Sequence, residues 1–447
     1  MFKKILVANR GEIAVRIIEA AHELGISTVA IFSEADRGAL HTRLADEAYC
    51  IGPASPQHSY LKIAAVMSAA EISRAEAIHP GYGFLAEDPH FVEVCEASKI
   101  AFIGPNYEVM RKAGDKLRAK EIACAAGVPV VPGSGALRSE EDLQRAVEQI
   151  GYPLLLKASA GGGGRGMRIV SNESELLEKF RAAQREAEAA FGDPTLYIEK
   201  YLSRARHIEV QIVADHYGNI VHWGERECSI QRRYQKLIEE SPSPALSEEM
   251  RQALCEAAVR VARALEYQNA GTVEFLVTGD EFYFIEINAR IQVEHPLSEV
   301  RVGKNLIKEQ IRIAAGERVG YSQDDLKLQG HAIECRINAE DPEKNFAPST
   351  GMIKIKALPG GHGVRLDTAL YDGLTMTPYY DSLLAKVIVH GQTRHEAVLK
   401  MINALKRFEV EGIKTTRDLC LEIVSSAEFM AGEVDTQFLE RKFTKNL

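Results

Sequence analysis

Apolar and polar positions in the first hundred residues follow the pattern of short strands separated by longer helices. Residues 5–8 form an apolar run typical of a buried strand, and apolar side chains at 13, 17, 21 and 24 share one face of a helix. Gly25 ends this helix, and a further strand is predicted at 28–32. A helix and two more strands follow, at 61–72, 77–78 and 101–103. Strands that alternate with helices predict a parallel sheet with helices on both faces.

The pattern changes twice further along the chain. After a helix at 117–126 and a linker that contains Pro and Gly, three short apolar strands accompany a long helix, which predicts a small domain. These elements lie at 153–158, 167–170, 196–200 and 174–191. From His207 the residues alternate between apolar and polar, and turn residues interrupt them, which predicts antiparallel hairpins over 207–223 and 272–287.

Composition narrows the class of protein. The 447 residues correspond to about three domains. The 54 basic and 63 acidic residues give a net charge of −9, which argues against a nucleic-acid-binding protein with its basic face. Seven cysteines without a C-x-x-C pair are typical of a reduced protein. Apolar runs are too short for a signal peptide or a membrane span, so we expect a cytoplasmic location.

Four consecutive glycines at 161–164 lie between Lys157 and Arg165, with a predicted strand on each side. Glycine lets backbone N–H groups approach an anion closely, so we interpret the run as a hairpin lid over phosphates. The run lacks the G-K-[ST] ending of a P-loop and does not lead into a helix. A flexible linker is the alternative, although linkers rarely separate two apolar strands.

Residues 282–295 combine strand alternation with reactive side chains. Alternate positions hold Glu286, Asn288, Arg290, Gln292 and Glu294. In an extended chain these residues share one face while the apolar ones pack inward, and a break after Asn288 would limit the shared face to the first two. An amphipathic surface strand is the alternative interpretation.

The chemistry of this segment suits a metal and an anion. Glu286 and Asn288 carry oxygen donors that Mg²⁺ prefers, and Glu274 on the preceding predicted strand could add another. The guanidinium of Arg290 can pair with a carboxylate-like anion through two parallel hydrogen bonds. Glu294 is a candidate general base.

The sequence resembles biotin carboxylase, the ATP-grasp component of biotin-dependent carboxylases, over nearly its whole length. The motifs that carry the resemblance lie at 7–14, 79–85, 114–116, 157–167, 206–209, 225–229, 231–233, 290–296 and 334–340. The resemblance implies an α/β and α+β protein with an ATP-grasp fold. It divides the chain into an N-terminal Rossmann-like parallel-sheet domain, an ATP-grasp region with a small mobile lid at about 131–203, and a mixed C-terminal domain, at 1–115, 116–315 and 316–447.

The resemblance also implies a role for each matching residue. Positions that match nucleotide-binding residues are Lys116, Lys157, Gly163, Gly164, Arg165, Met167, Glu199, Lys200, Tyr201, Leu202, His207, Gln231, Tyr234, Glu274 and Glu286. Positions that match metal ligands are Glu274, Glu286 and Asn288. Positions that match the bicarbonate and biotin pockets are Lys236, Arg290, Gln292, Val293, Arg336 and Tyr82. Catalytic roles fall on Arg290, Glu294, Lys236 and Arg336, with Glu294 as the base and Arg336 as the group that stabilises the biotin enolate.

The implied reaction needs partners. ATP, bicarbonate and Mg²⁺ or Mn²⁺, with two ions expected, would carboxylate biotin through carboxyphosphate. The sequence has no Ala-Met-Lys-Met segment, so we expect the biotin to arrive on a biotin carboxyl carrier protein and the product to pass to carboxyltransferase subunits. The resemblance favours acetyl-CoA carboxylase, which supplies malonyl-CoA for fatty acid synthesis, and a homodimer.

Three alternatives stay open. The first is that the protein is the biotin carboxylase subunit of a pyruvate or other acyl-CoA carboxylase. The second is another ATP-grasp ligase, although Arg290 and Arg336 match pockets outside the ATP site. The third is a regulatory nucleotide-binding subunit or a dinucleotide-binding oxidoreductase, although no G-x-G-x-x-G follows the first strand. Ala160, Tyr234 and Ala289 depart from the family pattern.

Overall fold

A five-stranded parallel sheet forms the N-terminal portion of the computed structural model, which describes residues 1–159 and 167–443. The strand order is β3 (Glu47–Gly52), β2 (Ser27–Ser33), β1 (Lys4–Val7), β4 (Ala77–His79) and β5 (Ala101–Phe102). Alternate residues of β1 pack against α1 on one face and against α3 and α4 on the other. The helices of this portion are α1 (Gly11–His22), α2 (Leu40–Leu44), α3 (Ile63–Ser73), α4 (Pro89–Ala97) and α5 (Tyr107–Gly114). The predicted parallel sheet with helices on both faces is confirmed.

The loop that follows β4 is held against the end of β1. Asn9 Nδ2 donates hydrogen bonds to Pro80 O at 2.7 Å and to Tyr82 O at 2.8 Å. Gly81 has a φ of +63°, and a Cβ there would lie 3.0 Å from Asn9 Nδ2. This close approach explains why a glycine occupies the middle of the loop.

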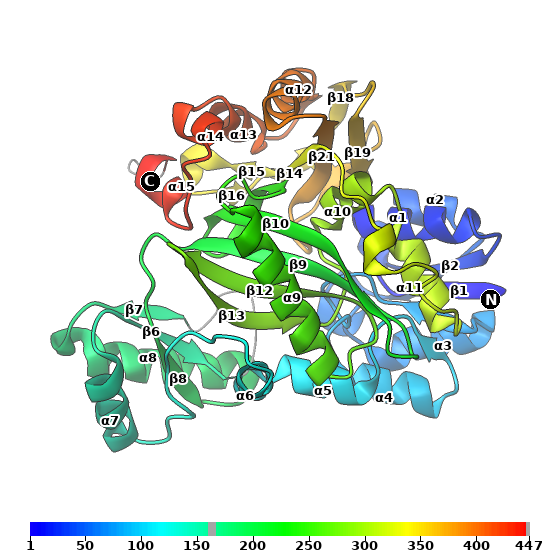
Figure 1. The fold of residues 1–447 in the computed structure, drawn as a ribbon. Helices are drawn as coiled ribbons and strands as arrows, with labels where there is room; N and C mark the ends of the chain where they lie inside the picture. The colour runs from blue at the N-terminus through cyan, green and yellow to red at the C-terminus, as the bar shows by residue number, and fades with distance from the viewer. Residues whose placement is uncertain (160–166, 444–447) are drawn as a thin grey trace.

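A three-stranded antiparallel sheet with two helices builds the small domain that the sequence predicts (Figure 1). The strands are β7 (Arg168–Val170), β6 (Leu154–Ala158) and β8 (Leu196–Lys200), and the helices are α7 (Glu140–Ile150) and α8 (Glu173–Phe191). Leu143, Leu156 and Phe180 belong to its separate apolar core. The sequence between β6 and β7 holds Gly163, Gly164 and Arg165, which lie outside the described residues. The prediction that the glycine run joins two strands is confirmed.

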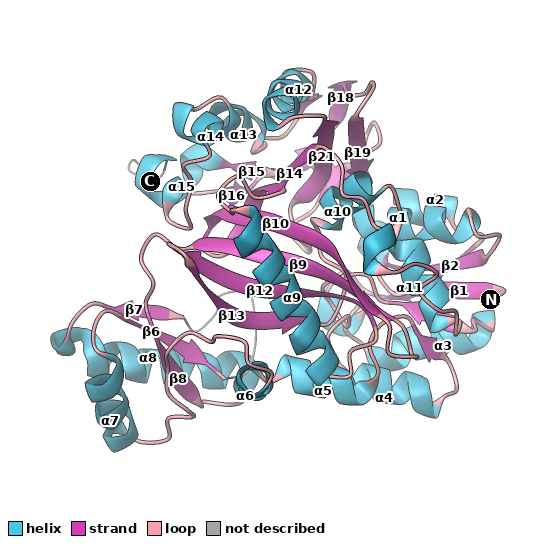
Figure 2. Cartoon of the chain, viewed as in Figure 1, coloured by secondary structure: helices cyan, strands magenta, loops and turns pink. Residues whose placement is uncertain are grey.

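An eight-stranded antiparallel sheet occupies the centre of the molecule (Figures 1 and 2). Its strand order is β13 (Glu281–Asn288), β12 (Asn269–Thr278), β9 (Arg206–Ala214), β10 (Ile220–Arg232), β11 (Gln235–Ser241), β14 (His331–Asn338), β21 (Leu383–Gly391) and β19 (Val364–Thr368). Helix α9 (Glu248–Ala264) crosses one face of it. On β9, Ile208, Val210 and Ile212 point to the core under α9, so the alternate residues point to the opposite face.

This central sheet crosses the expected boundary near residue 316. Strand β11 of the ATP-grasp region pairs directly with β14 of the C-terminal portion, with Ile238 opposite Cys335. The two portions therefore share a sheet as well as an interface. The ATP-grasp region also contains the helices α6 (Lys116–Ala125), α10 (His295–Val302) and α11 (Leu306–Ala314).

The C-terminal portion packs helices on the far end of the sheet. Its helices are α12 (Arg394–Lys406), α13 (Arg417–Val424), α14 (Ala427–Ala431) and α15 (Phe438–Phe443). Three two-stranded pairs complete it, β15 (Glu340–Asp341) with β16 (Ala347–Pro348), β17 (Gly351–Met352) with β20 (Thr375–Met376), and β18 (Lys354–Ala357) with β22 (Glu409–Glu411). Within the described residues, none of the helices is long and apolar enough to cross a membrane.

Candidate active site

Charged side chains cross the face of the large sheet that lies opposite α9, one from each of four neighbouring strands. Glu286 on β13 is directly opposite Glu274 on β12. Glu274 is in turn opposite Glu209 on β9, and Glu209 is opposite Arg226 on β10. We call these four residues the charged row. Glu274, Glu209 and Arg226 are buried, and buried charges need partners.

The outer end of the charged row gathers the three predicted metal ligands. Glu274 and Glu286 face each other, and Asn288 Nδ2 donates to Glu274 Oε1 at 3.0 Å. Two carboxylates and an amide oxygen match the donor set that Mg²⁺ prefers, so the residues present fit the ion. His207 Nε2 lies 3.0 Å from Glu274 Oε2, and His207, Glu209 and Glu274 bring three potential ligand atoms together beside these residues.

Lys236 on β11 is the cation at the centre of the site. Its Nζ lies 2.5 Å from Glu209, 3.0 Å from Glu274 and 2.6 Å from Glu294. Burial by itself lowers the pKa of Lys236, but the three carboxylates raise it well above its ordinary value. Lys236 is therefore a permanent positive charge in this site.

Glu294 is fully buried between two cations at the start of α10. Its Oε1 accepts a hydrogen bond from Lys236 and its Oε2 accepts one from Arg336 at 2.8 Å. Burial by itself raises the pKa of Glu294, but Lys236, Arg336 and Arg226 lower it well below its ordinary value. Arg336 is also held by Glu239, whose Oε1 accepts from its Nε at 2.6 Å. The geometry places an ionised carboxylate where it can accept a proton.

Strand β13 ends at Asn288, so the shared polar face includes only Glu286 and Asn288. Beyond it the chain turns, and Arg290 lies among three side chains. Arg290 Nη1 donates to Gln292 Oε1 at 2.9 Å, Nη2 to Asn288 Oδ1 at 3.3 Å, and Nε to Glu87 Oε2 at 2.9 Å. Glu87 comes from the N-terminal portion and holds the guanidinium over the turn.

The lysines expected at the phosphates are paired with carboxylates. Lys116 Nζ lies 3.1 Å from Glu286 Oε2. Glu199 holds two lysines, Lys157 at 2.7 Å and Lys120 at 2.6 Å. Burial and Lys157 lower the pKa of Lys116, and Glu286 raises it above its ordinary value. Each expected lysine is therefore paired with a carboxylate, Lys116 with one on β13 and Lys157 with one on β8.

The other expected nucleotide residues that the structure describes lie at or near the ends of strands β7, β8 and β10. Met167 precedes β7, and Lys200, Tyr201 and Leu202 lie at the end of β8. Gln231 is buried near the end of β10 and pairs in register with Lys236. Tyr234 lies in the β10–β11 turn with a φ of +66° and is 44 % exposed.

Tyr82 connects the N-terminal portion to the Arg336 side of the site. Its hydroxyl donates to Glu12 Oε2 at 2.5 Å, and Glu12 Oε1 lies 2.7 Å from Lys386 Nζ. Lys386 is fully buried and donates to Val293 O at 3.0 Å. This hydrogen bond connects Val293, the residue before Glu294, to strand β21.

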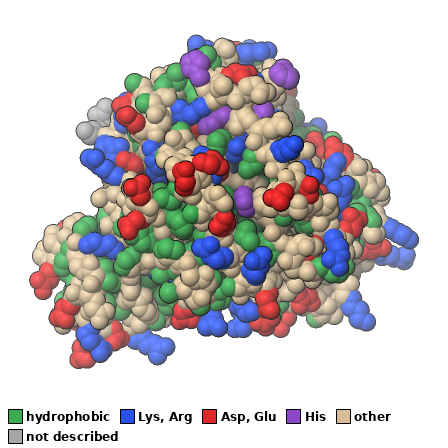
Figure 3. Space-filling view, in the orientation of Figure 1, with side chains coloured by type: hydrophobic (Ala, Val, Ile, Leu, Met, Phe, Trp, Pro, Cys, Tyr) green, Lys and Arg blue, Asp and Glu red, His purple; other side chains and the backbone are tan. Residues whose placement is uncertain are grey.

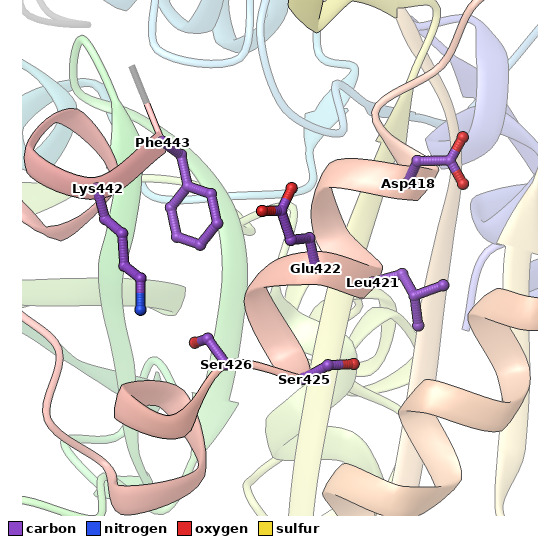
Figure 4. Close-up of a pocket in the computed structure, with 7 residues that line it drawn as sticks. All are labelled: Asp418, Leu421, Glu422, Ser425, Ser426, Lys442 and Phe443. Atoms are coloured by element: carbon purple, nitrogen blue, oxygen red, sulfur yellow. The ribbon is translucent and has the colours of Figure 1, made fainter. Parts of the chain in front are cut away.

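A separate surface pocket of about 510 Å³ contains none of the expected site residues. Figure 4 shows Lys442 and Phe443 of α15 across from Glu422 of α13 and from Ser425 and Ser426. Acidic and basic side chains are interspersed over the face seen in Figure 3, as the charge pattern predicts. The pocket contains no residue of the charged row.

Sequence reasoning missed the carboxylates and lysines that hold the expected residues in place. These are Glu87, Glu209, Glu239, Lys120 and Lys386. Glu209 could have been identified from the sequence, because it lies at a polar position of the alternating strand, two residues after His207. The others depend on contacts between distant segments, which spacing along one strand does not reveal.

Replacing Glu199 with glutamine is expected to lower the free energy of unfolding at pH 7 by about 3 kcal/mol, because two buried lysines lose their anion. Burial raises the pKa of Glu199, but Lys157 and Lys120 lower it below its ordinary value. The stabilisation is therefore present above the ordinary pKa of glutamate and is lost as the pH falls through the lower, folded value. Denaturant unfolding at pH 7 and pH 4 measures this difference.

The exposed Glu148 of α7 provides the matched control. Glu148→Gln should change the unfolding free energy by less than about 0.5 kcal/mol. An equally small effect of Glu199→Gln would show that the two lysines do not depend on Glu199.

Three family models together match most of the chain. "Biotin carboxylase, N-terminal domain" matches residues 1–110, and "Biotin carboxylase C-terminal domain" matches 334–441. "Carbamoyl-phosphate synthase L chain, ATP binding domain" matches the region between them, at 115–321.

Individual relatives agree with these matches. Biotin carboxylase 1 of Bacillus subtilis is 52% identical over 443 residues, which are 98% of each chain. A pyruvate carboxylase subunit of Methanothermobacter thermautotrophicus is 52% identical over 98% of this chain and 90% of its own. The crystal structure of the biotin carboxylase domain dimer of 2-oxoglutarate carboxylase from Hydrogenobacter thermophilus, with MgADP, ADP and bicarbonate, is 51% identical. It covers 99% of this chain and 98% of its own with a TM-score of 0.96. The chain belongs to the biotin carboxylase family of ATP-dependent ligases.

Proposed function

We propose that this protein carboxylates biotin on a separate carrier protein, consumes ATP and bicarbonate, and releases ADP and phosphate. The observation that carries the proposal is the position of Glu294, an ionised and fully buried carboxylate that contacts Lys236 on one side and Arg336 on the other. Glu294 can thus take a proton from an anion that Lys236 binds, while Arg336 binds a second substrate.

The ATP side of the site supplies positive charge and oxygen donors. Lys116 and Lys157 would exchange their carboxylate partners for phosphates. Gly163, Gly164, Arg165 and Met167 would cover the phosphates, and residues 199–202 would recognise adenine. His207, Gln231 and Tyr234 would contact the nucleoside. Mg²⁺ held by Glu274, Glu286 and Asn288 would neutralise phosphate charge during transfer.

Bicarbonate would bind between Lys236, Arg290, Gln292 and the backbone of Val293. Glu294 takes its proton, and the resulting oxyanion attacks the γ-phosphate to form carboxyphosphate and ADP. Carboxyphosphate breaks into carbon dioxide and phosphate, and the phosphate removes the proton from the biotin ureido nitrogen. Arg336 then donates to the ureido oxygen as negative charge develops there, and the nitrogen attacks carbon dioxide. Tyr82 would line this biotin pocket.

The partners proposed here are a biotin carboxyl carrier protein and carboxyltransferase subunits. We propose acetyl-CoA as the final acceptor. Pyruvate is the second candidate, because the pyruvate carboxylase relative is as similar to this chain as biotin carboxylase 1 of Bacillus subtilis. The domain dimer among the similar structures supports a homodimer. Copurification from the native source would identify the carrier and the acceptor.

ADP release by the purified protein with MgATP tests the reaction. We expect release to require bicarbonate and to rise when free biotin is added, with carboxybiotin formed in proportion. Release that needs no bicarbonate, together with no carboxylation of biotin, would contradict the proposal and favour another ATP-grasp ligase.

A further inference from the structure

Strand β14 buries a glutamate that has no partner among the described residues. Glu334 is 0 % exposed, and neither of its carboxylate oxygens accepts a hydrogen bond. Among the described residues no cation forms an ion pair with it, since Arg336 pairs with Glu239 and Glu294, and Lys386 with Glu12. An ionised carboxylate is strongly disfavoured in such a place, so the protonated acid is the favoured form.

The side chain lies on the same face of β14 as Arg336. Ile333, Cys335 and Ile337 belong to the apolar core of the C-terminal portion, so Glu334 and Arg336 point to the other face. Lys386 on β21 is directly opposite Arg336. Glu334 is therefore part of the polar layer that holds Arg336.

Glu239 on β11 is directly opposite Glu334 in the register of the sheet. Side chains paired in this way have Cβ atoms about 5 Å apart. Glu239 is buried and uses Oε1 to hold Arg336 Nε, but its Oε2 has no hydrogen-bond partner. Two adjacent buried carboxylates cannot both be ionised at low cost, and one proton turns one of them into a donor for the other. Because Arg336 stabilises an anion at Glu239, the proton belongs on Glu334.

The charges that face the pair favour one shared proton. Burial raises the pKa of Glu334 well above its ordinary value, Lys386 and Arg336 lower it, and Glu239 and Glu294 raise it. Burial likewise raises the pKa of Glu239 to about 7, against the effect of Arg336. Lys386 is itself engaged by Glu12 and Val293 O. On α10, burial and Lys386 keep the pKa of His295 well below its ordinary value, so this ring adds no charge.

We propose that Glu334 carries a proton and donates it in a hydrogen bond to Glu239, so that the Glu239 anion holds Arg336 in position for the biotin substrate. Arg336 donates from Nε to Glu239 and from Nη2 to Glu294. Its Nη1 makes no hydrogen bond to the described residues. Nη1 is then the nitrogen left for the substrate. This inference rests on the proposed function, and Glu334 is a positioning residue because it touches no substrate.

Two variants separate the hydrogen bond from the shape of the side chain. Glu334→Gln keeps the shape and an N–H donor toward Glu239, whereas Glu334→Leu leaves Glu239 Oε2 without a donor. We expect Glu334→Gln to retain kcat/KM for biotin and Glu334→Leu to lower it by about tenfold or more, as the loss of a positioning partner does elsewhere. Bicarbonate-dependent ADP release without biotin should stay close to normal in both.

Ile388→Val is the matched packing control, because Ile388 lies opposite Glu334 on β21. It should leave the ratio of the two activities unchanged. Equal loss of both activities in Glu334→Leu would overturn the positioning role, and so would equal impairment of Glu334→Gln and Glu334→Leu.

The pH profile gives a second activity readout. In the unmodified protein the pair loses its proton as the pH rises, so kcat/KM for biotin should fall on the alkaline side. In Glu334→Gln the amide cannot lose that proton, so the fall should move to higher pH. An identical alkaline limb in both proteins would contradict the shared proton.

Infrared difference spectroscopy tests the proton without any assay of activity. At pH 7 the unmodified protein should show the band of a protonated carboxylic acid that Glu334→Gln lacks. No such band would overturn the proposal, whatever reaction the protein catalyses. A band in a protein that never carboxylates biotin would leave the shared proton in place and refute both the positioning role and the proposed function.

Discussion

Replacing Glu294 with glutamine is expected to lower bicarbonate-dependent ADP release and biotin carboxylation together, by about 10²–10⁴-fold. Glutamine keeps the shape of the side chain but cannot accept a proton. Lys236 keeps Glu209 and Glu274, and Arg336 keeps Glu239, so each cation still has a carboxylate and the fold should persist. Steady-state rates of ADP and carboxybiotin formation measure the effect.

The pH dependence of the unmodified protein adds to this test. Burial raises the pKa of Glu294, but Lys236 and Arg336 hold it well below its ordinary value. Glu294 is therefore ionised in the free protein down to acidic pH, and kcat/KM for bicarbonate should show no acidic limb from it near neutrality. Glu240→Gln is the control, because Glu240 is buried in the same sheet and bound to His331 and Arg394. An ADP release rate unchanged by Glu294→Gln would remove Glu294 as the base.

Replacing Arg336 with alanine is expected to affect the two reactions unequally. Biotin carboxylation should fall by about 10²–10³-fold, because a fixed donor to a developing negative charge is lost. ADP release without biotin should fall much less, since Lys236 still holds Glu294. Both rates can be measured on one preparation, with free biotin present or absent.

Arg394→Ala is the matched control for this variant. Arg394 is a partly buried arginine that binds Glu240 on the same sheet, away from the charged row. It should lower stability without changing the ratio of the two rates. Equal losses of both reactions in Arg336→Ala would reject its role at the biotin.

Much of the fold could be predicted because local patterns decide it. The ATP-grasp fold with a parallel N-terminal sheet is confirmed, and so is the resemblance to biotin carboxylase. Alternation placed Glu286 and Asn288 on one face, and the structure brings both to Glu274. A bulge at Ile285 puts Phe284, at the same spacing, in the apolar core instead. The sequence shows the alternation as far as residue 295, but the strand ends at Asn288, and alternate positions share no face in the turn that holds Arg290.

The partners of the expected residues could not be predicted in the same way. Glu87 reaches Arg290 across 203 positions of the chain, and Glu239 reaches Arg336 across 97. Such contacts follow from how strands and domains pack, which no local pattern records. The roles of the individual site residues and the domain boundaries stay predictions, which the variants above address for Glu294 and Arg336.

The charged row also limits how this protein can vary in length. Its order copies the order of strands β13, β12, β9 and β10, at about 4.8 Å per strand. One extra residue already lies between their turn and this pair, because Phe275 is opposite Phe284 and Glu274 is opposite Glu286, so Ile285 forms a bulge in β13. Phe284 lies in the apolar core under α9, and the bulge turns Glu286 to the opposite face, so the loss of this one residue would turn Glu286 toward the core. Insertions and deletions should therefore be tolerated in the outer loops and be absent from these two strands in any functional variant of this chain.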